Sequence, residues 1–255
     1  MPIQRLNCSD ELQPFFNELP MPKGLNGNEQ SLNSFPIGQS FAQNVSAMEI
    51  FRRMQDCHDS INEGRFFLCL AQKKSFPEIY KEPIYEWGIN WVKSQFVISS
   101  LHSYNASFDL FLQVLWIFYK LYQYNAPCVK EITNDNLTLI LKNCKIDKFR
   151  KECNRTIIGE VVFNAINNFC DAPCYAEIHN LCNTIKHRQR VEFIELSKNK
   201  HNFLLFGDYY NSHSSILKKS IPKVIENLKD FHNELSNLFT ARCARNVFLS
   251  TFLFV

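Results

Sequence analysis

Residues 107–122 read SFDLFLQVLWIFYKLY, and this stretch is the clearest indication of fold class in the chain. Its apolar side chains recur at intervals of three and four residues, the spacing of one face of an α-helix. Trp116 and Ile117 widen that face, so we expect the helix to be buried on most sides. The stretch contains Asp109 and Lys120 and is too short to cross a bilayer. It predicts a central helix of an all-α protein.

The composition of the whole chain agrees with an all-α fold. Only 7 Gly and 10 Pro occur in 255 residues, which leaves few turn residues for a many-stranded sandwich or barrel. Hydrophobic residues make up 45% and charged residues 21%, a balance that excludes disorder as the main state. The net charge of +3 is too small to indicate nucleic-acid binding by itself.

Helical periodicity extends over most of the chain outward from this stretch. We expect helices at 43–73, 85–104, 107–123, 136–143, 147–153, 156–169, 171–190 and from 220 onward, and the second and third could be one long kinked helix. Residues 191–196 and 202–210 are β-rich runs around a short polar turn, which predicts a β-hairpin.

These elements predict the domain organisation. Residues 1–40 mix Pro, Gly, Asn and Ser with few periodic apolar positions, which indicates an irregular N-terminal arm. Residues 41–255 are expected to form one helical bundle, with the β-hairpin near 191–210 inserted before the last long helix. The apolar tail, 247–255, is interpreted as a helix-end or subunit contact rather than as a membrane anchor.

The cellular compartment is predicted from the first residues and from the cysteines. The N-terminus shows no signal-peptide pattern. The 10 cysteines are scattered, at a density well below that of a disulfide scaffold. We therefore expect a cytoplasmic protein with reduced thiols and without a membrane partner.

The helix expected at 171–190 carries the densest group of chemically active side chains. Its core face is formed by Ile178, Leu181, Cys182 and Ile185. A second arc of about 100° is polar and contains His179, Asn183, Lys186, His187 and Arg190. This polar stripe is either a solvated helix face or a binding surface.

Residues 179–188, HNLCNTIKHR, resemble the signature helix of HEPN domains. Proteins of this family are α-helical bundles, usually dimeric, and many are metal-independent ribonucleases of toxin–antitoxin and phage-defence systems. The family motif places four to six residues between an Arg and a later His. His187 matches the motif His and Asn183 matches a polar position before it, but residues 180–182 contain no Arg.

The resemblance implies an activity on RNA and a homodimer, with no cofactor or metal. Attack of a 2′-hydroxyl on the adjacent phosphorus needs a group that transfers a proton and a group that stabilises charge. The resemblance assigns proton transfer to His187, with Asn183 orienting it. Arg190 is the candidate for the missing Arg if the helix extends that far, and His179, Lys186 and Arg188 are candidates for substrate contacts.

Two other functional interpretations stay open at this stage. The chain could be a non-cleaving relative that serves as a scaffold or interaction protein, with the polar stripe making dimer contacts. It could also be an unrelated helical protein in which the short motif occurs by chance.

Two further groups of residues are weighed against simpler explanations. Cysteines and histidines cluster at 170–187, but on a helix Cys182 and His187 point about 140° apart, so they could share a metal only if the helix breaks. Residues 142–155 carry six basic and two acidic side chains. This second group is either a phosphate-contacting track or, as we favour, a solvated helix surface.

Overall fold

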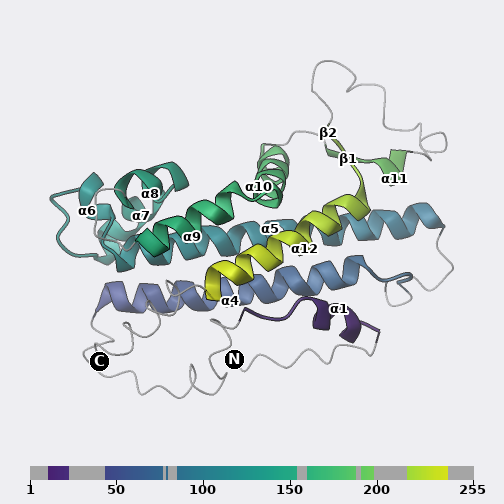
Figure 1. The fold of residues 1–255 in the computed structure, drawn as a ribbon, viewed down its shortest axis with the longest axis horizontal. Coiled ribbons are helices and arrows are strands. Elements are labelled where there is room, and N and C mark those ends of the chain that lie inside the picture. The colour runs from purple at the N-terminus through teal and green to yellow at the C-terminus, as the bar shows by residue number, and fades with distance from the viewer. Residues whose placement is uncertain are drawn as a thin grey trace. The chain divides into compact units, whose positions relative to one another are not determined.

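The computed structural model describes residues 11–22, 44–76, 79, 85–153, 160–187, 191–197 and 217–240. These residues are almost entirely helical and include one sheet of two short strands (Figure 1). The expected all-α bundle, with a small β element before the last long helix, is confirmed. Among the described residues, no helix combines the length and the apolar composition needed to cross a bilayer.

Two long helices dominate the first half of the chain, α4 (Val45–Ala71) and α5 (Glu86–Phe118). Helix α5 is one continuous element of 33 residues, where the sequence allowed two. Neither Asn105 nor Ser107 interrupts it: Asn105 donates to the carboxylate of Asp109 at 3.2 Å, and the Ser107 hydroxyl donates to the Tyr104 carbonyl at 2.7 Å. Because both polar side chains find partners within the helix, they do not end it.

Eight further helices lie among the described residues. They are α1 (Gln13–Glu18), α6 (Tyr122–Asn125), α7 (Asn134–Lys142), α8 (Ile146–Cys153), α9 (Glu160–Asp171), α10 (Pro173–Lys186), α11 (Ile194–Ser197) and α12 (Ile221–Thr240). The short helices α1, α6 and α11 were not expected. Helix α1 lies in the region interpreted as an irregular arm, and it has a Pro in its first turn, where the missing N–H is tolerated.

The two strands pair differently from the hairpin that the sequence predicted. Strand β1 (Val191–Phe193) begins at the expected residue, but it pairs in parallel with β2 (Leu217–Lys219). Parallel strands need a crossover of about a dozen or more residues, and the intervening chain is long enough to provide one. The second expected strand, at 202–210, lies outside the described residues.

The chain divides into two compact units. Unit 1 contains Met1–Pro20, Asn62–Ser103 and Pro173–His232, and unit 2 contains Met21–Ile61, Tyr104–Ala172 and Asn233–Val255. Helices α4, α5 and α12 each supply residues to both units. The predicted boundary near residue 40 lies outside the described residues and stays a prediction.

Each unit has its own apolar core. In unit 2, Phe108 packs on Phe169 with ring centroids 4.7 Å apart, and Phe111 packs on Phe239 at 4.6 Å. Trp116 is fully buried there, which confirms the burial predicted for residues 107–122. The core of unit 1 is built from α1, the second half of α4, the first half of α5, α10 and α12, and includes Leu19, Leu68, Leu101, Ile178 and Leu228.

Candidate functional site

Helix α10 positions the side chains that the sequence singled out. Pro173 is its first residue, a position that suits the fixed backbone angle of proline. Ile178, Leu181 and Cys182 are buried, as the helical wheel predicted. The apolar face of α10 therefore belongs to the core of unit 1, and its polar face is half-buried or exposed.

Four of the predicted site residues lie in the described part of α10 and the turn after it. His179 is half-buried and stacks on Tyr175, with ring centroids 5.4 Å apart. Asn183 is half-buried, whereas Lys186 and His187 are exposed. The His187 amide donates to the Asn183 carbonyl at 2.9 Å, so His187 closes the last turn of the helix. An accessible imidazole and an accessible ammonium group thus stand side by side in the sequence at this end of α10.

The other two predicted site residues, Arg188 and Arg190, lie outside the described residues. Placing Arg190 on the stripe required the helix to reach it, but the described helix ends at Lys186. The assignment of Arg190 as the replacement for the motif Arg remains a prediction, as does that of Arg188 as a substrate contact.

Cys182 occupies one of the three positions where the HEPN motif would have its Arg, and it is fully buried. Its Sγ lies 3.5 Å from Nδ1 of His102 on α5. Burial, and then the charge of Lys186, lower the pKa of His102 below its ordinary value of 6.5. His102 therefore lies against the buried Cys182, and this one of the three motif positions points into the protein.

Sequence reasoning missed His102 because it lies 80 residues before its partner Cys182. A signal was present in the spacing of Trp91, Gln95, Ile98 and His102, which follow one another at helical intervals of four, three and four residues. These side chains share one face of α5.

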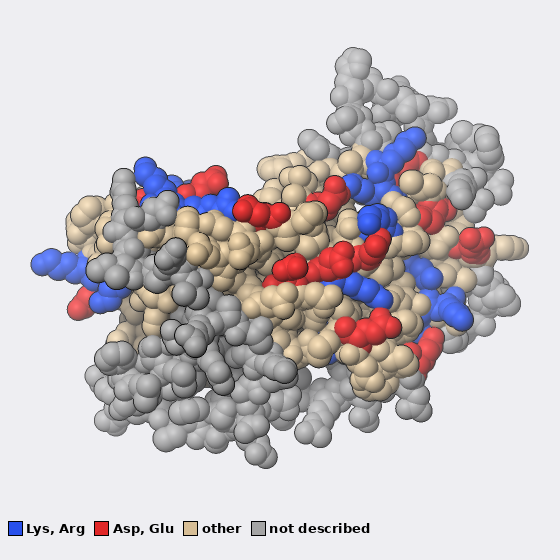
Figure 2. Space-filling view, in the orientation of Figure 1, with Lys and Arg blue, Asp and Glu red and all other residues tan. Residues whose placement is uncertain are grey.

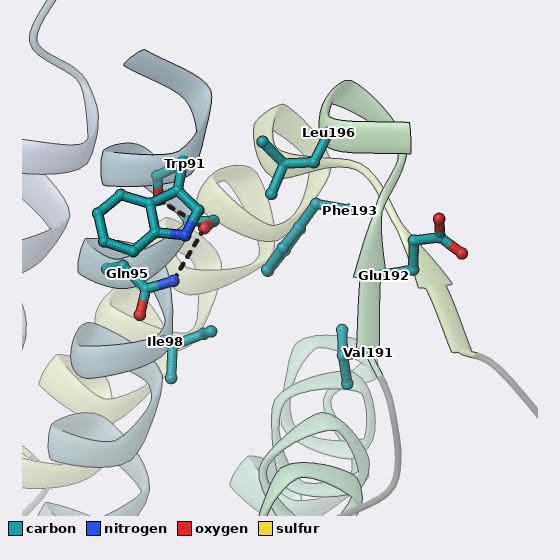
Figure 3. A pocket seen from close by; sticks show the side chains of 8 residues that line it. Trp91, Gln95, Ile98, Val191, Glu192, Phe193 and Leu196 are labelled. Atoms are coloured by element: carbon teal, nitrogen blue, oxygen red, sulfur yellow. Dashed lines mark hydrogen bonds between the residues drawn. The ribbon is translucent and has the colours of Figure 1, made fainter. Parts of the chain in front are cut away.

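The first three of these residues form one wall of a pocket of about 230 Å³ in unit 1. The other wall comes from β1 and α11, with Val191, Phe193 and Leu196 directed toward α5 and Glu192 directed away from it (Figure 3). Trp91 is 43% exposed, an unusual exposure for a large aromatic side chain.

A second polar cluster lies in unit 2. Arg53 makes an ion pair with Glu49 at 2.6 Å and donates to Gln113, and both charged residues are buried. Burial opposes ionisation of Glu49, but its hydrogen bond to Arg52 and the charge of Arg53 outweigh this, and the pKa of Glu49 is lowered. Because the opposite charges neutralise each other, we assign this cluster to the stability of unit 2.

The basic residues at 142–155 also belong to unit 2, whereas α10 belongs to unit 1. Lys142, Lys145 and Lys151 are exposed, and Arg150 pairs with Asp171 at 3.4 Å. On the face drawn in Figure 2, the described basic and acidic side chains are interspersed. This mixture is typical of a solvated surface.

The described residues contain no group of three or more His, Cys, Asp or Glu side chains arranged to hold a metal ion. Cys174 and Cys182 are buried, and Cys170 is half-buried.

Comparisons with known proteins leave the function to be argued from these residues. No protein-family model matches the sequence, and the searches of curated proteins and of solved structures returned no significant match.

Proposed function

We propose that the protein acts on RNA at the C-terminal end of α10, as a HEPN-like protein and a metal-independent ribonuclease. The observation that carries the proposal is the exposed pair Lys186 and His187, with Asn183 one turn before His187 on the same helix. The motif residues available for chemistry are therefore accessible from solvent. The proposed setting is the cytoplasm, in a toxin or phage-defence system, with the protein acting as a homodimer.

In this proposal His187 transfers the proton. A neutral imidazole carries a ring nitrogen that can accept the proton of the attacking 2′-hydroxyl of RNA. The phosphorus–O5′ bond then breaks, and the leaving oxygen takes up a proton. Lys186 contributes positive charge near the phosphate, as a flexible point charge rather than the planar fork of an arginine. His179 and Arg188 are proposed substrate contacts, and Arg190 the further charge clamp.

The test is cleavage of a single-stranded RNA by the parent protein and by His187→Ala. We expect the substitution to abolish cleavage and leave the far-ultraviolet circular dichroism unchanged, because the side chain is exposed. The matched control is His58→Ala, which removes an imidazole from α4 that contacts Asp59 at 3.2 Å. Undiminished cleavage by His187→Ala, or an inactive parent protein, would contradict the ribonuclease proposal.

A second candidate function is a non-catalytic interaction or scaffold protein. Two observations favour it: residues 180–182 contain no Arg, and the described charges in Figure 2 are interspersed. In this case the stripe of α10 makes contacts between subunits. Light scattering of a Lys186→Glu variant discriminates the two, since dissociation of a dimer by this change, together with an inactive parent protein, supports the interaction role.

A further inference from the structure

The pocket between α5 and β1 is narrow and has two unlike walls. We call it the slot and define it by Trp91, Gln95 and Ile98 on one side and Val191, Phe193 and Leu196 on the other (Figure 3). Sites for drug-sized ligands occupy about 300–1,000 Å³. At about 230 Å³ the slot suits a smaller group, of the size of a single planar ring system.

The side chains of the slot favour a flat aromatic ligand with a polar edge. Trp91 offers an exposed indole, and Phe193 presents a ring from the opposite wall. The exposed Gln95 carries an amide with donors and an acceptor, and its nitrogen makes a long hydrogen bond, 3.3 Å, to Ser94 Oγ. Unpaired RNA bases are recognised by this combination, with stacking on aromatic rings and hydrogen bonds to the base edge.

The slot is close to the α10 site along the chain and along α5. Strand β1 begins at Val191, four residues after His187, so the Cα atoms of these two residues are at most about 14 Å apart. His102, one turn beyond Ile98 on the same face of α5, contacts Cys182 of α10. Both the slot and the exposed end of α10 lie in unit 1.

We propose that the slot binds one unpaired base of the RNA whose phosphate is placed at Lys186 and His187. Trp91 and Phe193 hold the ring, and Gln95 hydrogen-bonds to its edge. The inference rests on the proposed function, because it takes RNA as the ligand of the α10 site, and it adds the element that recognises the base.

The experiment measures binding of a short, fluorescently labelled single-stranded RNA of mixed sequence, and of the same RNA with abasic nucleotides throughout. The protein is the full chain carrying His187→Ala, so that cleavage does not interfere. Trp91→Ala is compared with Tyr124→Ala, a change at an aromatic residue of similar exposure, 45% against 43%, in unit 2.

We expect Trp91→Ala to weaken binding of the complete RNA on the order of tenfold, as loss of one base stack does. The protein with Trp91 intact should bind the abasic RNA about as weakly as Trp91→Ala binds the complete RNA. Trp91→Ala should not weaken binding of the abasic RNA further. Tyr124→Ala should leave both affinities unchanged. Gln95→Ala should alter the preference among the four bases more than the mean affinity.

Two outcomes would contradict base binding in the slot while leaving RNA binding by the protein intact. They are equal affinities for complete and abasic RNA, or an unchanged affinity for complete RNA in Trp91→Ala. A loss of base-dependent binding in Trp91→Ala, together with cleavage that persists in His187→Ala, would support the slot and reject the catalytic role of His187. Absence of any RNA binding would reject both.

Discussion

Cys182 stands at a position where the HEPN motif can have its Arg, but this position is buried. The side chain is fully enclosed and lies against His102, so an Arg at this position would have its charge inside unit 1. Asn180, two residues earlier, also falls in the motif window but is exposed. An Arg introduced at position 180 could therefore reach solvent and stabilise charge, whereas an Arg introduced at position 182 could not.

This difference predicts opposite results for two single substitutions. Cys182→Arg should destabilise the protein by about 3 kcal/mol or more, because it buries an unpaired charge in a packed site. Asn180→Arg should change the unfolding free energy by less than about 0.5 kcal/mol, as surface changes usually do. Urea unfolding of both variants checks the prediction. A Cys182→Arg variant as stable as the parent would contradict the burial of this position.

His232 on α12 is a second residue whose environment makes a prediction. It is 1% exposed, and its Nε2 donates to the Pro20 carbonyl at 2.9 Å. Burial lowers its pKa from 6.5 to about 4, the charge of Arg65 acts in the same direction, and the hydrogen bond only partly opposes them. The folded protein therefore favours the neutral ring more strongly than the unfolded chain does.

Because the folded pKa is the lower one, this contribution to stability is present above pH 6.5 and is lost as the pH falls toward 4. The gap between the two values corresponds to at most about 3 kcal/mol. In His232→Gln, which keeps a donor and does not titrate, the loss of stability between pH 7 and pH 4 should be smaller by about this amount. Urea unfolding of the parent protein and of His232→Gln across this range measures it.

At the scale of elements, Arg65 of α4 joins helix α1 to the rest of unit 1. Arg65 of α4 donates from Nε to the Leu19 carbonyl at 2.5 Å, and its guanidinium lies over the Phe16 ring, 5.3 Å from the centroid. Leu12 and Leu19 are buried. By contrast, the ion pair between Glu18 and Lys229 is solvent-exposed.

We predict that Arg65→Ala releases α1 and that Lys229→Ala does not. The first change removes a buried hydrogen bond to a carbonyl and a ring contact, which together contribute about 2 kcal/mol or more. The second removes an exposed ion pair, which contributes less than about 1 kcal/mol. Amide hydrogen exchange in residues 11–22 should accelerate in Arg65→Ala and stay near the parent rate in Lys229→Ala. Equal exchange rates in the two variants would mean that Arg65 does not stabilise the packing of α1.

Some features of the helices and strands could be predicted from the sequence alone, and others could not. The apolar faces of residues 107–122 and of α10 were predicted correctly because helical periodicity is a local property. The parallel pairing of β1 with β2 was not, since local β-propensity does not specify which strand lies alongside. The contact of His102 with Cys182 likewise depends on the packing of α5 against α10. For the candidate site, the sequence singled out Lys186 and His187, which the structure shows to be exposed. The slot was not predicted, because its two walls come from segments far apart in the chain.

At the scale of the whole molecule, charge constrains how RNA could be bound. The net charge is +3, and described acidic and basic side chains are interspersed on the face in Figure 2. A protein that covers many phosphates with Lys and Arg shows a steep dependence of affinity on salt. Because the net charge is only +3, recognition is expected to depend more on base contacts and on a small number of phosphates.

We therefore predict a shallow salt dependence for single-stranded RNA, to which Lys186 contributes a measurable part. Neutralising one phosphate of a single strand changes the slope of log affinity against log salt by about 0.7. Lys186→Ala should reduce the slope by roughly this amount, whereas Lys218→Ala, which removes an exposed lysine from β2, should leave it unchanged. Trp91→Ala should lower the affinity at every salt concentration without changing the slope, because stacking releases no counterions. Parallel slopes for the parent and Lys186→Ala would place the phosphate away from the end of α10.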